Sequence, residues 1–349
     1  MSTPLPPAAA LRRIAFLLER AREPSYRVSA FRTAAAVVDG MSDDQLDLKI
    51  RTNTLKDLKG VGPKTAAVVV QAHKGQVPEY LAKLEEAHAE LVPMADDVAE
   101  FRAALRGDLH THSDWSDGGS PIREMAEAAM ALGHEYLALT DHSPRLTVAN
   151  GLSPERLEKQ LDVVAALNEE LAPFRILTGI EVDINVDGSL DQTDELLGRL
   201  DVVVASVHSD LRADAKSMTA RMLTAVANPH TDVLGHCTGR LVIGRRQRDG
   251  TQKPRPESQF DAEAVFSACI EFGTAVEINS RPERLDPPKR LLSLAVDLGC
   301  EFAIDTDAHA PGQLDWQYNG VERAIETGVP VERVVNSRTA DDLLAWTRA

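Results

Sequence analysis

The spacing of apolar positions changes near residue 107. Before it, apolar residues recur every three or four positions in residues 8–22 and 25–38, which predicts two amphipathic helices. Ser42, followed by two aspartates, indicates the N-cap of a third helix, and residues 76–106 also have a helical pattern. We therefore predict a small all-α domain at 1–95 and a linker at 96–106.

From residue 107 onward, short apolar runs alternate with helical patterns. Helices are expected between the strands, for example at 121–132, 154–170, 191–200 and 287–298. The predicted strands are 107–112, 136–141, 175–183, 202–208, 233–236, 275–280 and 302–307. This alternation predicts the α/β class: a distorted (β/α)7 TIM-like barrel over 107–349, with its chemistry at the carboxyl ends of the strands.

Metal-competent side chains recur at these strand ends. His110 and His112 alternate on the first strand, so both side chains point to one face, and Asp117 follows in the loop. A His-Thr-His sequence alone is equally compatible with an ordinary polar strand end. The other predicted strand ends, however, carry His142, Glu181, His208, His236, Asp307 and His309. Six of the ten histidines thus recur where a barrel brings them together, which predicts a multinuclear metal site.

Other polar residues near these positions have supporting roles in this interpretation. Asp108 and Asp114 are candidates for further oxygen ligands or hydrogen-bond acceptors, and Asp141 and Asp183 for orienting ligand histidines. The histidines outside the pattern are expected at the surface or in packing contacts: His73, His88, His134 and His230.

A second pattern lies in the N-terminal part. Gly60 and Gly62 flank Val61 in a tight hairpin, and Pro63 opens the next helix. Glycines let a phosphate approach the backbone, and the helix that follows offers free N–H groups, with Lys59 and Lys64 beside them. This is typical of a helix-hairpin-helix that binds the DNA backbone; the alternative is a plain packing corner between two helices.

Charge is distributed unevenly along the chain. A net charge of −16 argues against a nucleic-acid partner. However, residues 1–90 hold 13 Lys and Arg against 11 Asp and Glu, whereas residues 91–349 hold 25 against 43. The three scattered cysteines do not form a disulfide framework, and neither a signal peptide nor an apolar run of membrane-spanning length is evident. We therefore expect a cytoplasmic protein with no membrane partner.

The strand-end motifs resemble those of the PHP (polymerase and histidinol phosphatase) domain. Gly235 to Arg240 and Glu277 to Asp286 are similar, more narrowly, to the C-terminal PHP domain of bacterial family X DNA polymerases. Residues 1–95 resemble the helical DNA-binding domain of those enzymes. Only about a dozen residues separate the two parts, so no polymerase palm and no polymerisation are expected. Val68 stands where related polymerases carry a Schiff-base lysine, so lyase activity is not expected either.

The resemblance implies nine ligands for three divalent ions. His110, His112, Glu181 and Asp307 would hold the first ion. Glu181 would bridge to a second ion, held with His208 and His236, and the third would take Asp117, His142 and His309. Because Asp117 replaces a histidine found in some relatives, Mn²⁺ or Fe²⁺ is favoured over a purely Zn²⁺ cluster.

Phosphoester hydrolysis is the implied reaction, with Glu181, Asp307, His110, Arg240 and Arg281 as candidate catalytic residues. Arg281 and Arg284 are alternatively explained by structural pairing with Glu277, Glu283 or Asp286. The basic segment 244–255 is interpreted as a flexible loop that either binds a DNA backbone or is simply solvated.

Three functions follow from these patterns. The first is a metal-dependent 3′–5′ exonuclease or 3′-end processing enzyme in DNA repair, which the hairpin favours. The second is a small-molecule phosphomonoesterase similar to histidinol phosphatase. The third is a non-catalytic DNA-binding protein with a structural metal cluster, which the complete ligand set argues against.

Overall fold

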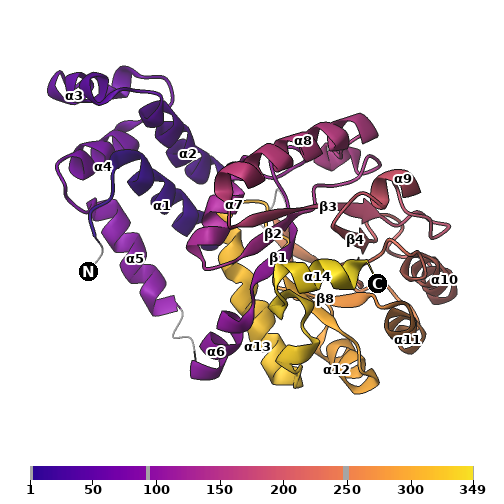
Figure 1. Cartoon of the computed structure of the whole chain (residues 1–349). Coiled ribbons are helices and arrows are strands. Elements are labelled where there is room, and N and C mark those ends of the chain that lie inside the picture. The colour runs from indigo at the N-terminus through magenta and orange to yellow at the C-terminus, as the bar shows by residue number, and fades with distance from the viewer. Residues whose placement is uncertain (1–2, 92–94, 247–250, 349) are drawn as a thin grey trace. The chain divides into compact units, whose positions relative to one another are not determined.

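The structure, a computed structural model, describes residues 3–91, 95–246 and 251–348. Two compact units, Met1–Ala95 and Asp96–Ala349, make up the chain (Figure 1). Each unit has its own hydrophobic core.

The first unit is entirely helical, as predicted. Its helices are α1 (Pro7–Arg20), α2 (Ser25–Asp39), α3 (Asp43–Arg51), α4 (Pro63–His73) and α5 (Glu79–Leu91), with a 3₁₀ turn at Leu55–Asp57. The side chains of Leu11, Ile14 and Phe31 lie in its core. Ser42 caps α3 as expected, since its hydroxyl accepts from the N–H of Gln45 and the Gln45 side chain accepts from the N–H of Ser42.

The second unit is built on a seven-stranded parallel sheet in the order β1-β2-β3-β4-β5-β8-β9. The strands are β1 (Gly107–Thr111), β2 (Tyr136–Leu139), β3 (Arg175–Asp183), β4 (Val202–Ser206), β5 (Val233–Leu234), β8 (Ala275–Asn279) and β9 (Phe302–Asp305). A parallel bridge between Thr111 and Ala308 links the two ends of this order. The sheet is therefore a nearly closed barrel, which confirms the predicted fold class and all seven strands.

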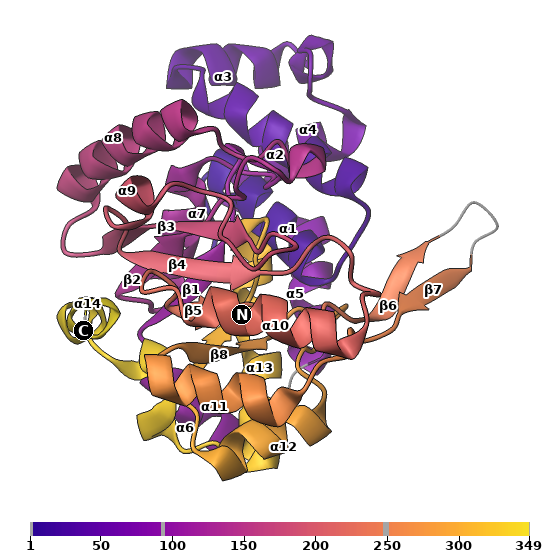
Figure 2. The same ribbon diagram turned by 90° about the vertical axis from the view of Figure 1, so that its right-hand side faces the viewer.

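Helices lie around the outside of the barrel (Figures 1 and 2). They are α7 (Ile122–Ala131), α8 (Pro154–Leu171), α9 (Asp194–Leu197), α10 (Ala215–Val226), α11 (Ala262–Phe272), α12 (Lys289–Leu298), α13 (Gln317–Thr327) and α14 (Ala340–Thr347). The helix expected at 191–200 is shorter than predicted, because Thr193 caps its start and the chain leaves the helix at Gly198. Across the described ranges, no helix combines the length and apolar character needed to cross a bilayer.

Two segments differ from the sequence-based expectation. Residues 96–106 are helical as predicted, in α6 (Asp96–Ala104), but they are not a linker, because Val98 and Leu105 contribute to the core of the second unit. The segment 244–255, expected as a loop, lies largely within a two-stranded antiparallel ribbon of β6 (Leu241–Arg246) and β7 (Gln252–Arg255). Backbone pairing therefore orders its flanks, whereas Arg248 and the side chains of Arg245 and Arg246 lie outside the described residues.

Candidate metal centre

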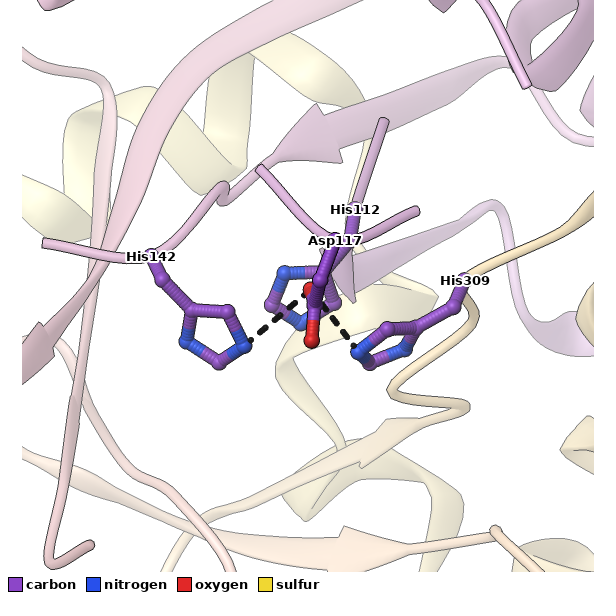
Figure 3. A group of neighbouring side chains, drawn as sticks. All are labelled: His112, Asp117, His142 and His309. Carbon is purple, nitrogen blue, oxygen red and sulfur yellow. Dashed lines mark ion pairs between the residues drawn. The ribbon is translucent and has the colours of Figure 1, made fainter. Parts of the chain in front are cut away.

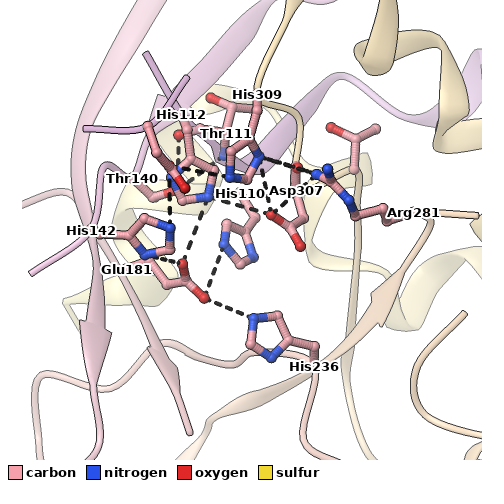
Figure 4. Close-up of polar contacts among 12 residues, drawn as sticks. His110, Thr111, His112, Thr140, His142, Glu181, His236, Arg281, Asp307 and His309 are labelled. Atoms are coloured by element: carbon pink, nitrogen blue, oxygen red, sulfur yellow. Dashed lines mark hydrogen bonds and ion pairs between the residues drawn. The ribbon is translucent and has the colours of Figure 1, made fainter. Parts of the chain in front are cut away.

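The side chains predicted from the strand ends converge at one end of the barrel. β1 delivers His110 and, one residue past its end, His112, while β3 delivers Glu181. The segments that follow the other strands bring His142, His208, His236, Asp307 and His309 into the same cluster (Figure 4). Residues nearly 200 positions apart thus meet because parallel strands end at the same side of a barrel.

Glu181 lies at the centre of the cluster. Its Oε1 atom is 2.9 Å from Nε2 of His236, 3.2 Å from Nε2 of His208 and 3.4 Å from Nε2 of His110. Its Oε2 atom is 2.7 Å from Nδ1 of His142 and 3.7 Å from Nε2 of His112. The two oxygens of this one carboxylate therefore face different histidines, as a bridging ligand requires.

Asp117 lies at the outer side of the cluster. Its Oδ1 atom is 3.4 Å from Nε2 of His142 and 3.3 Å from Nε2 of His309 (Figure 3). Potential ligand atoms lie within 4.8 Å of one another in three overlapping groups: His112, Asp117, His142 and His309; His110, His112 and Asp307; and His142, Glu181 and His208. With His236, which lies 2.9 Å from Glu181, all nine predicted positions are brought together, while their division among three ions stays a prediction.

Several buried ligand atoms fit a metal centre. Among the described residues, buried side-chain atoms of the cluster that have no hydrogen-bond partner are Nε2 of His110, both ring nitrogens of His112, Nδ1 of His142, Oε2 of Glu181, Nε2 of His208 and Nδ1 of His236. Leaving so many polar atoms buried without hydrogen bonds costs free energy unless another group binds them. Imidazole nitrogens and carboxylate oxygens are the ligands that Zn²⁺, Mn²⁺ and Fe²⁺ take in proteins. The donor set therefore fits divalent metal ions.

The electrostatics of His112 and Glu181 favour the protonation states that bind metals, whereas at His110 and His208 the pull of Glu181 outweighs burial and raises the pKa. Burial, together with the neighbouring His309 and His142, lowers the pKa of His112 well below its usual value, which keeps the ring neutral. Burial opposes ionisation of Glu181, but His208, His110 and His142 hold its pKa well below the usual range. Neutral imidazoles and ionised carboxylates are the ligand forms of these side chains.

Asp307 has a strained backbone. Its φ of +53° lies in the left-handed region, which few residues other than Gly adopt. Its Oδ1 atom lies 3.5 Å from Nε2 of His112 and 3.5 Å from Nδ1 of His309. Strained residues of this kind cluster at functional sites, which supports a role for Asp307 in this centre.

Carboxylates outside the nine positions hold the ligand histidines. The Oε1 atom of Glu277 is 2.6 Å from Nδ1 of His110, and Oδ1 of Asp183 is 3.2 Å from Nδ1 of His208. Sequence reasoning anticipated this role for Asp183 but not for Glu277, which it treated only as a partner for arginines. The signal available was the alternation within β8, which places Glu277 on the same face as Asn279.

Asp141 does not orient a histidine, contrary to the prediction. Its carboxylate accepts hydrogen bonds from the N–H and hydroxyl of Ser113, from Ser116 and from Gln160. Asp108 likewise is not part of the ligand cluster, because it accepts from the N–H and hydroxyl of Thr306. These two aspartates instead hold the backbone of the segments that follow β1 and β9.

Three arginines lie beside the cluster in different ways. The Nε atom of Arg284 is 2.9 Å from Oδ2 of Asp307, and its buried Nη1 is without a hydrogen-bond partner among the described residues. Arg281 donates to the carbonyl of Asp307 at 2.7 Å and lies over the ring of Trp316. Arg240 instead donates to the carbonyls of Arg284 and Leu285, so it holds the loop that carries the other two.

The alternative pairings of the arginines are only partly present. Arg281 lies 3.6 Å from Glu283, but Arg284 pairs with Asp307 rather than with Glu277. Burial opposes the charge of Arg284, but Asp307 and Glu181 raise its pKa, so the guanidinium remains charged.

The glycine hairpin of the first unit has the expected local geometry. Gly60 has a φ of +94°, and the N–H of Val61 bonds to the carbonyl of Leu58. Gly62 precedes the first turn of α4, and both Lys59 and Lys64 are exposed. The Nζ atom of Lys64 also lies 5.8 Å from the ring centre of Tyr80. Two exposed lysines thus flank the hairpin in the sequence, while the N–H of Gly62 donates to Oγ1 of Thr65 at 2.9 Å.

The histidines outside the cluster have structural contacts. His73 lies 2.8 Å from Asp47, and His134 lies 2.7 Å from Arg102 and is buried. The side chain of His88 lies outside the described residues. The interpretation of His73 and His134 as surface or packing residues agrees with these contacts.

Comparison with known families assigns both units. Residues 108–281 match the PHP domain, and residues 6–76 match a helix-hairpin-helix domain. The chain therefore carries a PHP domain preceded by an N-terminal helix-hairpin-helix domain.

The chain is similar both to a protein named as an exonuclease and to proteins named as phosphatases. The DNA polymerase/3′-5′ exonuclease PolX of Bacillus subtilis is 38% identical over 278 residues, which are 79% of this chain and 47% of that protein. The chain thus spans about half the length of that relative. A "Probable phosphatase" of Acetivibrio thermocellus is 29% identical over 66% of this chain and 90% of that protein. A crystal structure of histidinol phosphate phosphatase from Lactococcus lactis aligns with a TM-score of 0.45 at 18% identity, over 64% of this chain and 92% of that one.

Proposed function

We propose that this chain is a metal-dependent phosphoesterase that processes DNA ends, as a 3′–5′ exonuclease or 3′-end processing enzyme in repair, without polymerase activity. The observation that carries the proposal is the convergence, in one chain, of the nine side chains predicted as ligands, together with a helix-hairpin-helix unit. The similarity to the Bacillus subtilis exonuclease extends over 79% of the chain and supports it. The three buried free cysteines support the predicted cytoplasmic location.

Bound divalent ions would activate a water molecule and neutralise charge on the attacking and leaving oxygens of a phosphoester. The residues that would hold them are His110, His112, Asp117, His142, Glu181, His208, His236, Asp307 and His309. Glu277 and Asp183 fix the ring orientation of two of these histidines. Arg281 and Arg284 place two positive charges beside Asp307, where a planar guanidinium suits phosphate oxygens.

Binding of DNA would use the hairpin of the first unit. Lys59, Gly60, Gly62 and Lys64 offer charge and accessible backbone to a phosphate, without contact to a base. A Cβ atom added at Gly62 would meet no atom within 4 Å, so the surface in front of it is open to a ligand.

A small-molecule phosphomonoesterase is the second candidate. The relatives named as phosphatases align with about two thirds of this chain and nearly all of their own length. They therefore support a PHP unit that acts on its own, with the helical unit as an interaction module.

Hydrolysis of a labelled, 3′-recessed duplex with added Mn²⁺, compared with a generic phosphomonoester, tests the proposal. Wild type, His110→Ala and Gly62→Asp are compared. Stepwise 3′ shortening that His110→Ala abolishes and Gly62→Asp weakens is the expected result. Monoester turnover without DNA degradation, unaffected by Gly62→Asp, would overturn the nuclease proposal in favour of the phosphatase.

A further inference from the structure

The ribbon of β6 and β7 is the feature of the second unit that the reaction does not use. It projects from the barrel, as Figure 2 shows, and its strands pair at Leu241 with Arg255, Arg245 with Lys253 and Arg246 with Gln252, with a shift of register between the first two pairs. Residues 241–255 contain five Lys and Arg and a single acidic residue, Asp249. This composition contrasts with the strongly acidic remainder of residues 91–349.

The base of the ribbon is fixed to the metal centre. The N–H of Val242 donates to the carbonyl of Glu283 at 2.7 Å, in the loop that carries Arg281 and Arg284. Arg240, which directly precedes β6, donates to the carbonyls of Arg284 and Leu285. Arg255 at the end of β7 donates from Nε to the carbonyl of Gly239 at 2.6 Å, three residues after His236. The base of the ribbon is therefore tied to the loops that carry Arg281, Arg284 and His236.

Basic residues occupy paired positions across the ribbon. Arg245 and Lys253 are backbone partners in the register, and Lys253 is exposed. Two basic residues at opposite positions destabilise an isolated antiparallel pair. A polyanion would remove this repulsion. The second unit is acidic and repels a polyanion overall. A polyanion can therefore be attracted to this unit only through a local basic feature of this kind.

We propose that the β6–β7 ribbon binds the phosphate backbone of duplex DNA and holds it next to the metal centre. This inference rests on the proposed function and assigns the second unit a DNA contact of its own, separate from the helix-hairpin-helix. A two-stranded ribbon fits the groove of a DNA duplex, and contacts to phosphates through lysine and arginine carry no sequence preference.

The salt dependence of DNA binding tests the proposal. The full-length chain is titrated, by fluorescence anisotropy, against a labelled duplex with phosphorothioate 3′ ends that resist hydrolysis. Arg245→Gln/Lys253→Gln is compared with Lys159→Gln/Lys216→Gln, which removes the same charge from exposed positions on α8 and α10. The slope of log K against log salt is negative, and the loss of two phosphate contacts reduces its magnitude by about 2. The affinity lost between about 50 and 200 mM salt is then about tenfold smaller than for wild type.

Equal slopes for the ribbon variant and the control variant would overturn the proposal. A change in molar mass of the ribbon variant by light scattering, with an unchanged slope, would also overturn it and indicate a second copy of the chain as the partner. If the double variant is unstable, Lys253→Gln alone provides the test, and half the change in slope is expected. Binding is measured independently of hydrolysis, so failure of wild type to shorten DNA would reject the nuclease function without deciding this one.

Discussion

The Nδ1 atom of His110 lies 2.6 Å from Oε1 of Glu277, and both side chains are fully buried beneath the cluster. This contact leaves Nε2 of His110 facing Glu181 at 3.4 Å. A carboxylate on the far nitrogen of a ligand histidine orients the ring and raises its basicity. We predict that Glu277→Gln lowers the affinity for Mn²⁺ or Zn²⁺ by about 10–100-fold, measured by competition with a chromophoric chelator.

Glu271→Gln, an exposed position on α11, is the matched control and should keep the wild-type affinity. An unchanged affinity in Glu277→Gln, with the protein folded, would show that Glu277 only fills space beneath the cluster.

The contact between Arg284 and Asp307 leads to a second prediction. In the wild type, Nε of Arg284 holds Oδ2 of Asp307 at 2.9 Å, and Nη1 is buried without a hydrogen-bond partner among the described residues. Arg284→Lys keeps the positive charge but loses this planar group. We expect kcat for phosphodiester cleavage to fall about 10²-fold with a smaller change in KM, since a preorganised donor acts mainly on the transition state.

The dependence of kcat on metal concentration separates two roles for Arg284. At saturating metal, Arg284→Lys should still show the lower kcat, whereas the control Arg290→Lys, at an exposed site on α12, should match wild type. Full recovery of kcat at high metal concentration would mean that Arg284 acts only by stabilising Asp307 as a ligand.

The metal cluster could be predicted from the sequence because strand-end residues converge whatever the lengths of the loops between them. His110 and Asp307 are distant in sequence, yet the barrel topology alone places both at the same end. The alternation of side chains along a strand then selects His110 and His112 together. Neither step requires knowledge of how the strands are sheared relative to one another.

The contacts beneath the cluster could not be predicted in the same way. The contact of Glu277 with His110 joins β8 and β1, which are not neighbours in the sheet, so it depends on the packing inside the barrel. Asp141 was predicted to orient a ligand histidine, but it lies beyond the end of β2, and its carboxylate reaches Ser113 in the segment after β1 instead. In β6 and β7, Gly244 and Pro254 favoured a loop, whereas backbone pairing across the ribbon overrides that local preference.

The two glycines of the hairpin are expected to behave differently. A Cβ atom at Gly60, where φ is +94°, would lie 2.6 Å from Cγ2 of Thr33, whereas Gly62 has no atom within 4 Å of that position. We predict that Gly60→Ala destabilises the helical unit by about 1–3 kcal/mol, and that Gly62→Ala changes its stability by less than about 1 kcal/mol.

Urea unfolding of both variants, followed by circular dichroism, measures these effects. DNA affinity measured alongside should fall for Gly62→Asp, which retains the fold but places a negative charge where a phosphate would bind. Equal DNA affinity of Gly62→Asp and wild type would indicate that the hairpin is only a packing corner.

Asp232 leads to a prediction about pH. It precedes β5 and accepts a hydrogen bond from the N–H of Val203 at 2.7 Å. Burial, with Asp201 nearby, raises the pKa of Asp232 to about 8. The pKa of an aspartate in the unfolded chain is about 3.9, so Asp232 ionises in the unfolded state first as pH rises. The folded state therefore loses stability relative to the unfolded state between about pH 4 and 8.

Asp232→Asn removes this titration and retains an oxygen that can accept from Val203. We predict that the free energy of unfolding of Asp232→Asn minus that of wild type increases with pH across that window, by up to about 1.4 kcal/mol per pH unit. Above about pH 8 this difference should be constant. Urea unfolding at several pH values checks this, because the histidines contribute equally to both proteins and cancel in the difference. Asp297→Asn, at an exposed position on α12, should show a difference independent of pH. A difference for Asp232→Asn that is equally flat would mean that Asp232 is ionised in the folded protein.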